Sequence, residues 1–322
     1  MADAGRRGQL ARPFTKHLES NAMATTTAKK RKQPAAQPPK ILSAENFVRQ
    51  PWLLQGWSTR PGGRSDIYGR GALNLGFTSD DKRENVEQNR QIFLQRLGAQ
   101  KNKKPFPLVT LRQIHSAHIY LVDRVFAKPL AGDGMVTNKP GLVLGIQTAD
   151  CLPVLIADPV KKAVGAFHAG WRGTLARIVE KGVGAMRMHF GSDPEQLQAA
   201  LGPGIGGCCY SVGAEVQSEF ESQFDYAQEL FHTVFESDPV REKYPMLFLT
   251  ARAPGHSDLG PQIHLDLVKA NQRQLLSAGL KEENISASSL CTACNLKLLF
   301  SHRAERGKTG RMMAAIGIRP AG

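Results

Sequence analysis

LVLGIQTADCLPVLIADPVKKAVGAFHAGWRG, residues 142–173, is the stretch of sequence that decides the fold. It contains three apolar runs, at 142–146, 154–157 and 163–167, that are rich in residues favoured on a pleated, buried surface. An Asp-Pro pair and two lysines separate the second run from the third and supply turn chemistry. The stretch therefore predicts three strands joined by short turns.

Reactive side chains follow these predicted strands where the strand pattern stops. Asp150 and Cys151 come after the first run, and His168 comes directly after the third. Arg172 follows within the glycine-framed segment HAGWRG. Functional groups are commonly held on loops that a rigid sheet fixes in place. We therefore expect a functional site at these strand ends.

Sequence patterns on either side of this stretch predict helices and further strands. Asp80 or Asp81 is a candidate N-cap for a helix that ends at Gly98. Thr174 is a candidate N-cap for a second helix, which ends at Gly191. The other predicted elements are a helix at 267–276 capped by Asp266 and strands near 107–111, 246–249, 298–301 and 312–318.

The basic residues are concentrated at the N-terminus. The chain has 322 residues and a formal charge of +14, and residues 1–40 carry nine Lys and Arg against two Asp and Glu, which is half of that excess. This segment is poor in aromatic residues, so we predict a disordered basic tail. Its KKRK run at 29–32 fits a solvated tail better than a targeting or RNA-contacting patch. No repeat or linker divides residues 41–322, which we predict to form one mildly basic domain.

Cysteine usage and hydropathy indicate where the protein works. Five cysteines is an odd number, and Cys208 and Cys209 are adjacent, which favours reduced thiols over a disulfide framework. The sequence has no run of 18 apolar residues and no apolar core of the signal-peptide kind. We expect a soluble, cytoplasmic protein with no membrane partner, and no nucleic-acid partner beyond the basic tail.

Three residues near predicted strand ends could ligate a metal: His115, Cys151 and His168. Two imidazoles and a thiolate suit zinc, and three protein ligands leave the fourth tetrahedral position open, as catalytic sites do. Their spacing is not that of a local metal motif, so the residues alone favour three unrelated side chains. Cys151 and His168 also fit a nucleophile pair.

Two further segments contain motif-like patterns. Cys291 and Cys294 form a CxxC pair, which Cys208 and Cys209 could in principle complete to a four-thiolate site. A single CxxC is weak evidence, and we expect buried, unligated thiols. The GPGIGG segment at 202–207 matches a dinucleotide fingerprint in its letters only, because no helix follows it. We expect a tight loop whose backbone amides face an anion.

Arg172 is the first candidate for binding an anionic substrate. It follows His168 at a predicted strand-to-helix junction, where backbone amides and a guanidinium could hold phosphate. A surface ion pair would explain the residue equally well. Arg303 and Arg311, near the C-terminus, have the same two explanations.

Six motifs of the chain resemble, in this order, successive blocks of one protein family. They are QIHSAHIYLVD, TADCLPVLIADP, HAGWRGTL, LGPGIGGCCYSVGAEV, HLDLVKANQRQL and FSHRAERGKTGRMMAAIGI. These blocks are similar to those of the YfiH family, also called the laccase-domain or multicopper polyphenol oxidase family. Its members are mostly described as purine nucleoside phosphorylases. The resemblance covers roughly residues 50–320.

This resemblance implies an α+β fold, with mixed β-sheets flanked by helices in one YfiH-like domain, similar to the cytotoxic necrotizing factor deamidases. It implies that the zinc ligands are His115, Cys151 and His168. The family commonly has Phe-Ser-Tyr-Arg where this chain has His302 before Arg303, so Arg303 is matched and a tyrosine hydroxyl is missing. The polyphenol oxidase name implies several coppers, but the sequence has too few histidine clusters for a multicopper centre.

We therefore predict a zinc-dependent purine nucleoside phosphorylase acting on adenosine, inosine and S-methyl-5'-thioadenosine with phosphate, with adenosine deaminase activity. The predicted catalytic residues are Cys151, Asp150 and Arg172. Asp150 would shuttle protons or orient a ligand, and Arg172 and Arg303 would bind phosphate. The alternatives are a peptidoglycan-editing hydrolase of cytoplasmic muropeptide precursors with Cys151 as nucleophile or ligand, a copper-dependent polyphenol oxidase, and a non-catalytic binding module.

Overall fold

A computed structural model of the protein describes residues 39–235 and 261–321. The basic tail predicted at 1–40 lies almost wholly outside these ranges, and the strand predicted near 246–249 lies outside them too. Among the helices of the described ranges, none is long and apolar enough to cross a membrane.

A five-stranded mixed sheet, in the order β1-β2-β17-β9-β6, contains the first predicted strand of the 142–173 stretch. Its strands are β1 (Ile41–Leu42), β2 (Leu53–Ser58), β17 (Met312–Ile318), β9 (Val143–Thr148) and β6 (Leu108–Thr110). Only β6 and β9 run parallel. β17 lies at the centre, pairs with both β2 and β9, and is buried along its whole length. The strand predicted at 312–318 is confirmed.

A six-stranded sheet, in the order β16-β12-β10-β11-β8-β7, contains the other two predicted strands. Its strands are β16 (Ile285–Ala287), β12 (Gln198–Leu201), β10 (Leu152–Asp158), β11 (Ala163–Ala169), β8 (Gly134–Thr137) and β7 (Ile119–Leu121). β10 and β11 pair antiparallel across a turn in which Asp158 accepts the N–H groups of Val160 and Lys161. The predicted strand-turn-strand unit is confirmed.

The two sheets pack face to face and form the main core. Leu155 and Ala157 of β10 lie in a cluster with Ile316 of the five-stranded sheet. Val154 and Ile156, which alternate with them, lie in the cluster on the opposite face. Because both faces of β10 are covered, all seven of its residues are buried, which explains the uninterrupted apolar run that precedes Asp158.

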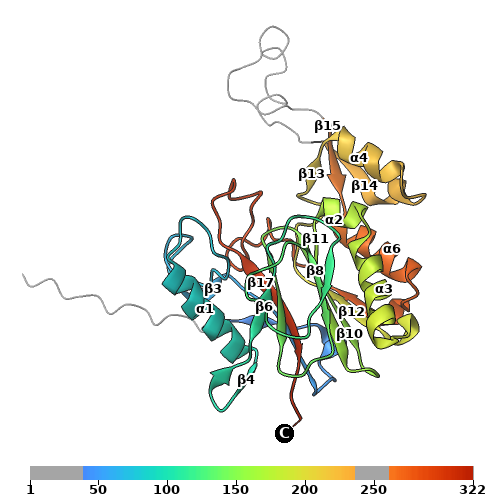
Figure 1. Ribbon diagram of the computed structural model, residues 1–322. Coiled ribbons are helices and arrows are strands. Elements are labelled where there is room, and N and C mark those ends of the chain that lie inside the picture. Colours follow the sequence, from blue (N-terminus) through green and yellow to red (C-terminus); the bar gives the residue numbers. More distant parts are fainter. Residues whose placement is uncertain (1–38, 236–260, 322) are drawn as a thin grey trace, which may run out of the picture. The chain divides into compact units, whose positions relative to one another are not determined.

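Helices cover the outer faces of both sheets (Figure 1). α3 (Ile178–Phe190) and α6 (Leu267–Ser277) pack on the six-stranded sheet. α1 (Arg83–Arg96) packs on the other sheet, with Phe93 in a cluster that includes Met313 of β17. The layers therefore run helix, sheet, sheet, helix, and the predicted α+β class with mixed sheets flanked by helices is confirmed.

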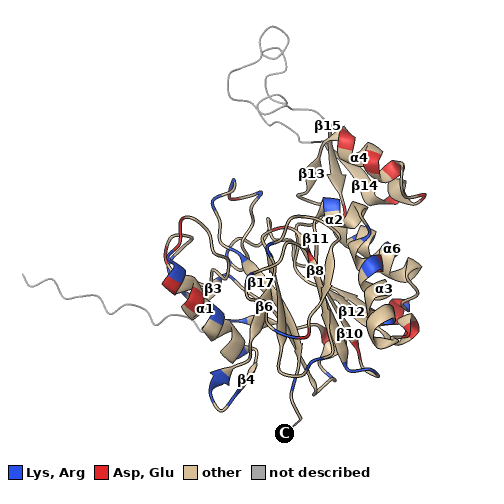
Figure 2. Ribbon diagram, viewed as in Figure 1, with Lys and Arg blue, Asp and Glu red and all other residues tan. Residues whose placement is uncertain are grey.

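Smaller elements complete the fold. They are β3 (Pro61–Ser65), the hairpin of β4 (Gln100–Lys101) and β5 (Lys104–Pro105), α2 (Trp171–Leu175), α4 (Ala214–Glu221), the sheet of β13 (Ser211–Val212), β15 (Pro261–Leu265) and β14 (Phe231–Phe235), and the 3₁₀ helices η1 (Glu45–Phe47), η2 (Pro194–Gln196), η3 (Ala227–Leu230) and η5 (Glu282–Asn284). Acidic residues are concentrated on α4 and basic ones on the β4–β5 hairpin (Figure 2).

The predicted start of α1 is wrong. Its N-cap is Lys82, and no side chain caps the helix. Asp81 instead accepts hydrogen bonds from Ser65 Oγ at 2.5 Å and from Asn74 Nδ2 at 2.7 Å. These tertiary partners compete with the helix for the carboxylate, so the aspartate fixes the preceding loop and does not cap.

The start predicted for α3 and one predicted strand are also wrong. Thr174 lies inside α2, and Arg177, with a φ of +60°, separates that short helix from α3. Residues 298–301 form the end of a turn, a bend and irregular backbone, not a strand. Their apolar side chains, including the fully buried Phe300, pack in a small cluster with Tyr68, which explains the strand-like composition.

The predicted helix ends and one predicted cap are confirmed. Gly98 and Gly191 follow α1 and α3 in the left-handed region, with φ values of +72° and +65°. Asp266 caps α6 by accepting the N–H of Lys269 at 2.9 Å. At these three boundaries the local signals predicted the structure correctly.

Gly182 and Gly184 of α3 give a matched test of how closely this helix packs on β11. A Cβ at Gly182 would lie 2.6 Å from two atoms of the buried Phe167 ring, whereas one at Gly184 would meet no atom within 4 Å. We expect Gly182→Ala to lower the free energy of unfolding by about 1–3 kcal/mol through overpacking. Gly184→Ala should raise it by roughly 0.5–1 kcal/mol, because alanine favours helix. Urea unfolding, monitored by circular dichroism, measures both free energies. Equal changes in the two variants would contradict the close packing of Gly182 on Phe167.

Candidate active site

Three residues that are far apart in the sequence converge beside the strand ends: His115, Cys151 and His168. Their potential ligand atoms all lie within 4.8 Å of one another, and the two imidazole centroids are 4.9 Å apart. Cys151 lies in the turn between β9 and β10, and the register of β10 and β11 pairs Pro153 with His168. His115 approaches from the loop after β6. The fold thus brings the three predicted ligands together.

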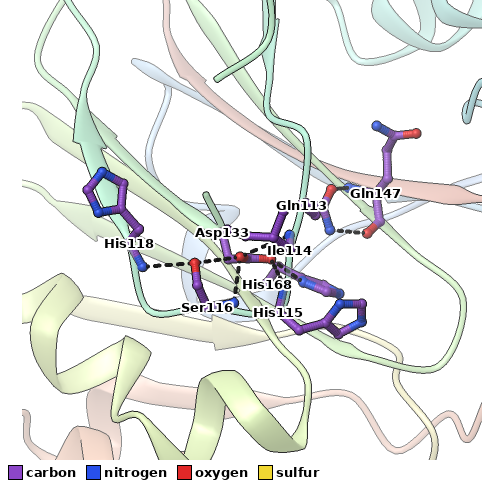
Figure 3. A network of polar contacts seen from close by, with 8 residues as sticks. All are labelled: Gln113, Ile114, His115, Ser116, His118, Asp133, Gln147 and His168. Atoms are coloured by element: carbon purple, nitrogen blue, oxygen red, sulfur yellow. Dashed lines mark hydrogen bonds and ion pairs between the residues drawn. The ribbon is translucent and has the colours of Figure 1, made fainter. Parts of the chain in front are cut away.

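Asp133, which the sequence analysis missed, organises this cluster (Figure 3). The residue is fully buried just before β8. Its Oδ1 accepts the N–H of His115 at 3.0 Å and lies 2.9 Å from Nδ1 of His168. Its Oδ2 accepts the N–H and hydroxyl of Ser116 at 2.7 and 2.8 Å. The carboxylate therefore fixes the loop that carries one histidine and the ring of the other, whose Nε2 is left for a ligand.

Burial and charge act in opposite directions on the pKa values in this cluster. Burial raises the pKa of Asp133, but hydrogen bonds from His168 and Ser116 outweigh it and bring the pKa down to about 2. Burial lowers the pKa of His168, but the charges and hydrogen bonds of Cys151 and Asp133 raise it to about 9. Burial raises the pKa of Cys151, and the neighbouring His168 and His115 lower it to about 6. A thiolate, the form of cysteine that binds metals, is thus favoured at neutral pH.

One residue of the cluster and the neighbour of another have unusual backbone conformations. His115 and Asp150 have φ values of +60° and +98°, in the left-handed region that side-chain-bearing residues rarely occupy. The carboxylate of Asp150 accepts the hydroxyl of Thr292 and the backbone N–H of Arg303, both at 2.6 Å. Such conformations persist only where surrounding contacts hold them, and they concentrate at functional sites.

A pocket of about 840 Å³ opens over the cluster and also contains the other predicted site residues. Arginines in its lining are Arg112, Arg172, Arg303 and Arg311, and aromatic residues are Tyr68, Phe77, Trp171 and Tyr210. The guanidinium of Arg172 lies 4.3 Å from the Trp171 ring. Arg303 donates from Nη1 to the carbonyl and hydroxyl of Ser211 at 2.8 and 2.7 Å. The pocket is therefore suited to an anionic ligand that also carries a ring.

The GPGIGG segment is a loop, as predicted, but it supports the Cys151 turn. Its N–H groups donate to the carbonyls of Pro153 at 2.8 Å and Asp150 at 2.7 Å, and to Sγ of Cys291 at 3.2 Å. The expectation that its amides face an anion is wrong for Gly202 and Ile205, whose N–H groups donate to backbone carbonyls. The loop fixes the strand end that carries Asp150 and Cys151.

Comparison with known proteins agrees with this architecture. The family described as "Multi-copper polyphenol oxidoreductase laccase" matches residues 54–319. The chain is 34% identical over 281 residues to a protein named purine nucleoside phosphorylase YlmD from Geobacillus stearothermophilus, covering 83% of this chain and 90% of that one. It is 35% identical over 278 residues to a purine nucleoside phosphorylase of Deinococcus radiodurans, covering 86% and 92%.

A solved structure extends the likeness to the fold. The crystal structure of the hypothetical protein YfiH from Bacillus licheniformis has a TM-score of 0.72 and 32% sequence identity, and the match covers 87% of this chain and 97% of that one. The sequence match and the structural match both cover most of the chain. The chain therefore belongs to the YfiH, or laccase-like, family of proteins, as its motifs predicted.

Proposed function

We propose that this chain is a zinc-dependent purine nucleoside phosphorylase that cleaves adenosine, inosine and S-methyl-5'-thioadenosine. The observation that carries the proposal is the convergence of His115, Cys151 and His168 on one pocket together with arginines. Relatives at 34% and 35% identity are named purine nucleoside phosphorylases, which supports this class of reaction.

The side chains of the cluster fit zinc. Two imidazoles and one thiolate are ligands that zinc accepts, and three of them leave a position for substrate or water. Asp133 holds Nδ1 of His168, which is the outer-sphere arrangement typical of metal-binding histidines. When bound, zinc supplies a Lewis acid. A multicopper centre fits less well, because no other group of potential ligands within residues 39–235 and 261–321 contains a histidine.

Arg172 and Arg303 are the proposed phosphate-binding residues. Arg172 is exposed in the pocket and forms no ion pair with the described residues. Its stacking on Trp171 orients the guanidinium without using up its charge. Phosphorolysis requires a phosphate dianion to be held against C1' as positive charge develops on the sugar. Two arginines that fix the anion lower the barrier through positioning and charge.

Adenosine deamination is proposed for the same pocket. Asp150 lines it, and hydrogen bonds from Thr292 and from the backbone of Arg303 hold its carboxylate in place. From there the carboxylate would carry a proton to or from the purine. The same contacts let Asp150 hold the C-terminal loop against the Cys151 turn, so it also has a positioning role.

The test of the proposal is chromatography of nucleoside reactions with and without phosphate. We expect the purified chain to release the free base and ribose 1-phosphate only when phosphate is present. A chain that consumes no nucleoside but releases an amino acid from a UDP-muramoyl precursor would be a peptidoglycan-editing hydrolase. Oxidation of a phenol only after copper is added would indicate a polyphenol oxidase.

Replacing Arg172 tests the phosphate site. We expect Arg172→Ala to raise the KM for phosphate roughly 10-fold to 100-fold, the effect of losing a hydrogen-bonded charge, with a much smaller change in the KM for inosine. The matched control is Arg187→Ala, an exposed arginine in the last turn of α3 and outside the pocket lining. A phosphate KM that is the same in both variants would contradict the assignment.

A further inference from the structure

Cys208, Cys209, Cys291 and Cys294 form a second group of potential metal ligands, outside the lining of the pocket. Their sulfurs all lie within 4.8 Å of one another, with 3.7 Å between Cys208 and Cys294 and 3.4 Å between Cys209 and Cys294. The expectation of buried thiols is wrong, because only Cys291 is buried, and Cys208 and Cys294 are exposed. Hydrophobic burial therefore does not explain why the sulfurs gather.

The backbone brings the two cysteine pairs together. One pair follows β12 and the other follows β16, and Gly204 and Cys291 form a parallel β-bridge between these segments. Thr292 N–H donates to the carbonyl of Gly204 at 2.9 Å. Gly206 N–H donates to Sγ of Cys291 at 3.2 Å, a contact that stabilises a thiolate. The four sulfurs are thus preorganised by main-chain contacts that do not depend on a metal.

Two of the six sulfur separations, 3.7 and 3.4 Å, are close to that of a tetrahedral zinc site, and the others are at most 4.8 Å. With Zn–S bonds of about 2.3 Å, two sulfurs of a tetrahedron lie about 3.8 Å apart, close to the separations found here. A disulfide would need about 2.05 Å. Four thiolates this close repel one another strongly, and a divalent cation is the partner that allows all four to lose their protons. We propose that these four cysteines bind one structural zinc ion.

This ion would join the two loops that support the catalytic pocket. Tyr210 lines the pocket and directly follows Cys209. Thr292 directly follows Cys291, and its hydroxyl donates to Asp150. Four protein ligands leave no open position, so the role of this zinc is to hold structure and not to react. The inference does not rest on the proposed phosphorylase activity.

The experiment counts metal in the reduced full chain by mass spectrometry. We expect the wild type to hold one zinc equivalent more than the variant Cys208→Ser/Cys294→Ser. The matched control is His115→Ala/Cys151→Ala, which alters the other cluster and should retain the cysteine-bound zinc whether or not the protein is a phosphorylase. Both serines replace exposed residues, so they can contact water. Equal zinc contents in wild type and serine variant would overturn the proposal.

A second measurement uses protein in which all four cysteines are unchanged. It tests the proposed zinc site even if the serine variant does not fold. Metal-stripped His115→Ala/Cys151→Ala protein is titrated with Co²⁺, and circular dichroism checks that it remains folded. We expect one equivalent to produce thiolate-to-cobalt charge-transfer absorption together with the visible bands of tetrahedral cobalt. Absence of these bands would overturn the proposal. So would a disulfide among these cysteines, detected as a mass lower by two hydrogens in the non-reduced mass spectrum of freshly purified wild type.

Discussion

Replacing His115 by alanine is expected to remove the metal of the pocket and nucleoside cleavage, whereas replacing His118 should leave both unchanged. Both histidines are exposed and lie in the same loop, but only His115 belongs to the cluster with Cys151 and His168. The His118 ring packs against Tyr120 instead, at 4.5 Å between centroids. Losing a direct ligand should lower kcat/KM by more than about 100-fold, because outer-sphere changes at metal sites already cost about 10-fold to 100-fold.

Zinc content and phosphate-dependent release of base from inosine measure the two effects. Cys151→Ala should behave as His115→Ala does, and circular dichroism should show all three variants folded. If His115→Ala retains its zinc, the ligand assignment fails. If His118→Ala loses activity to the same degree, disturbance of the loop and not loss of a ligand is the cause.

Asp133→Asn is expected to weaken both the metal site and the fold. Each oxygen of this buried carboxylate accepts N–H or O–H donors, among them the N–H groups of His115 and Ser116. An amide keeps one acceptor oxygen and places an NH₂ group against donors, so buried donors lose their partner. We expect the free energy of unfolding to fall by at least about 2 kcal/mol. Zinc affinity should fall about 10-fold to 100-fold, because the carboxylate that orients His168 is lost.

Asp158→Asn is the matched control for this substitution. Asp158 is as deeply buried as Asp133. It lies at the end of the β10–β11 pair that is opposite to the end carrying His168. Its Oδ1 accepts the N–H groups of Val160 and Lys161, and its Oδ2 has no partner in the described structure. An asparagine can keep the accepting oxygen there. Zinc titration and thermal unfolding should show a clearly smaller loss than in Asp133→Asn, and equal zinc affinities in the two variants would refute a role for Asp133 in the metal site.

The sequence predicted the strands of 142–173 because strand patterning is local. β10 and β11 follow directly from apolar runs separated by an Asp-Pro turn. The residues alone did not show that His115, Cys151 and His168 cluster, because the fold and not sequence spacing brings them together. Their places near predicted strand ends made them candidates, but only the resemblance to the family favoured a ligand set over three unrelated side chains.

Asp133 and Asp81 show why the rest was not predictable. The glycine-flanked Asp133 has no local signature of its role, since its partner His168 lies 35 positions further along the chain. Asp81 has the local signature of a helix cap, but Ser65 and Asn74 engage its carboxylate. In both cases partners outside the local motif decide what a carboxylate does, and the pattern of neighbouring residues does not reveal them.

The central place of β17 has a consequence for biosynthesis. This strand is the last of the described strands, yet it lies between β2 and β9, so the five-stranded sheet stays split while the ribosome is still making the preceding residues. The halves of that sheet can join only after Met312 to Ile318 have emerged. Folding of the sheet must therefore wait for this strand, and a nascent chain stalled before β17 would expose unpaired strand edges to chaperones or to aggregation.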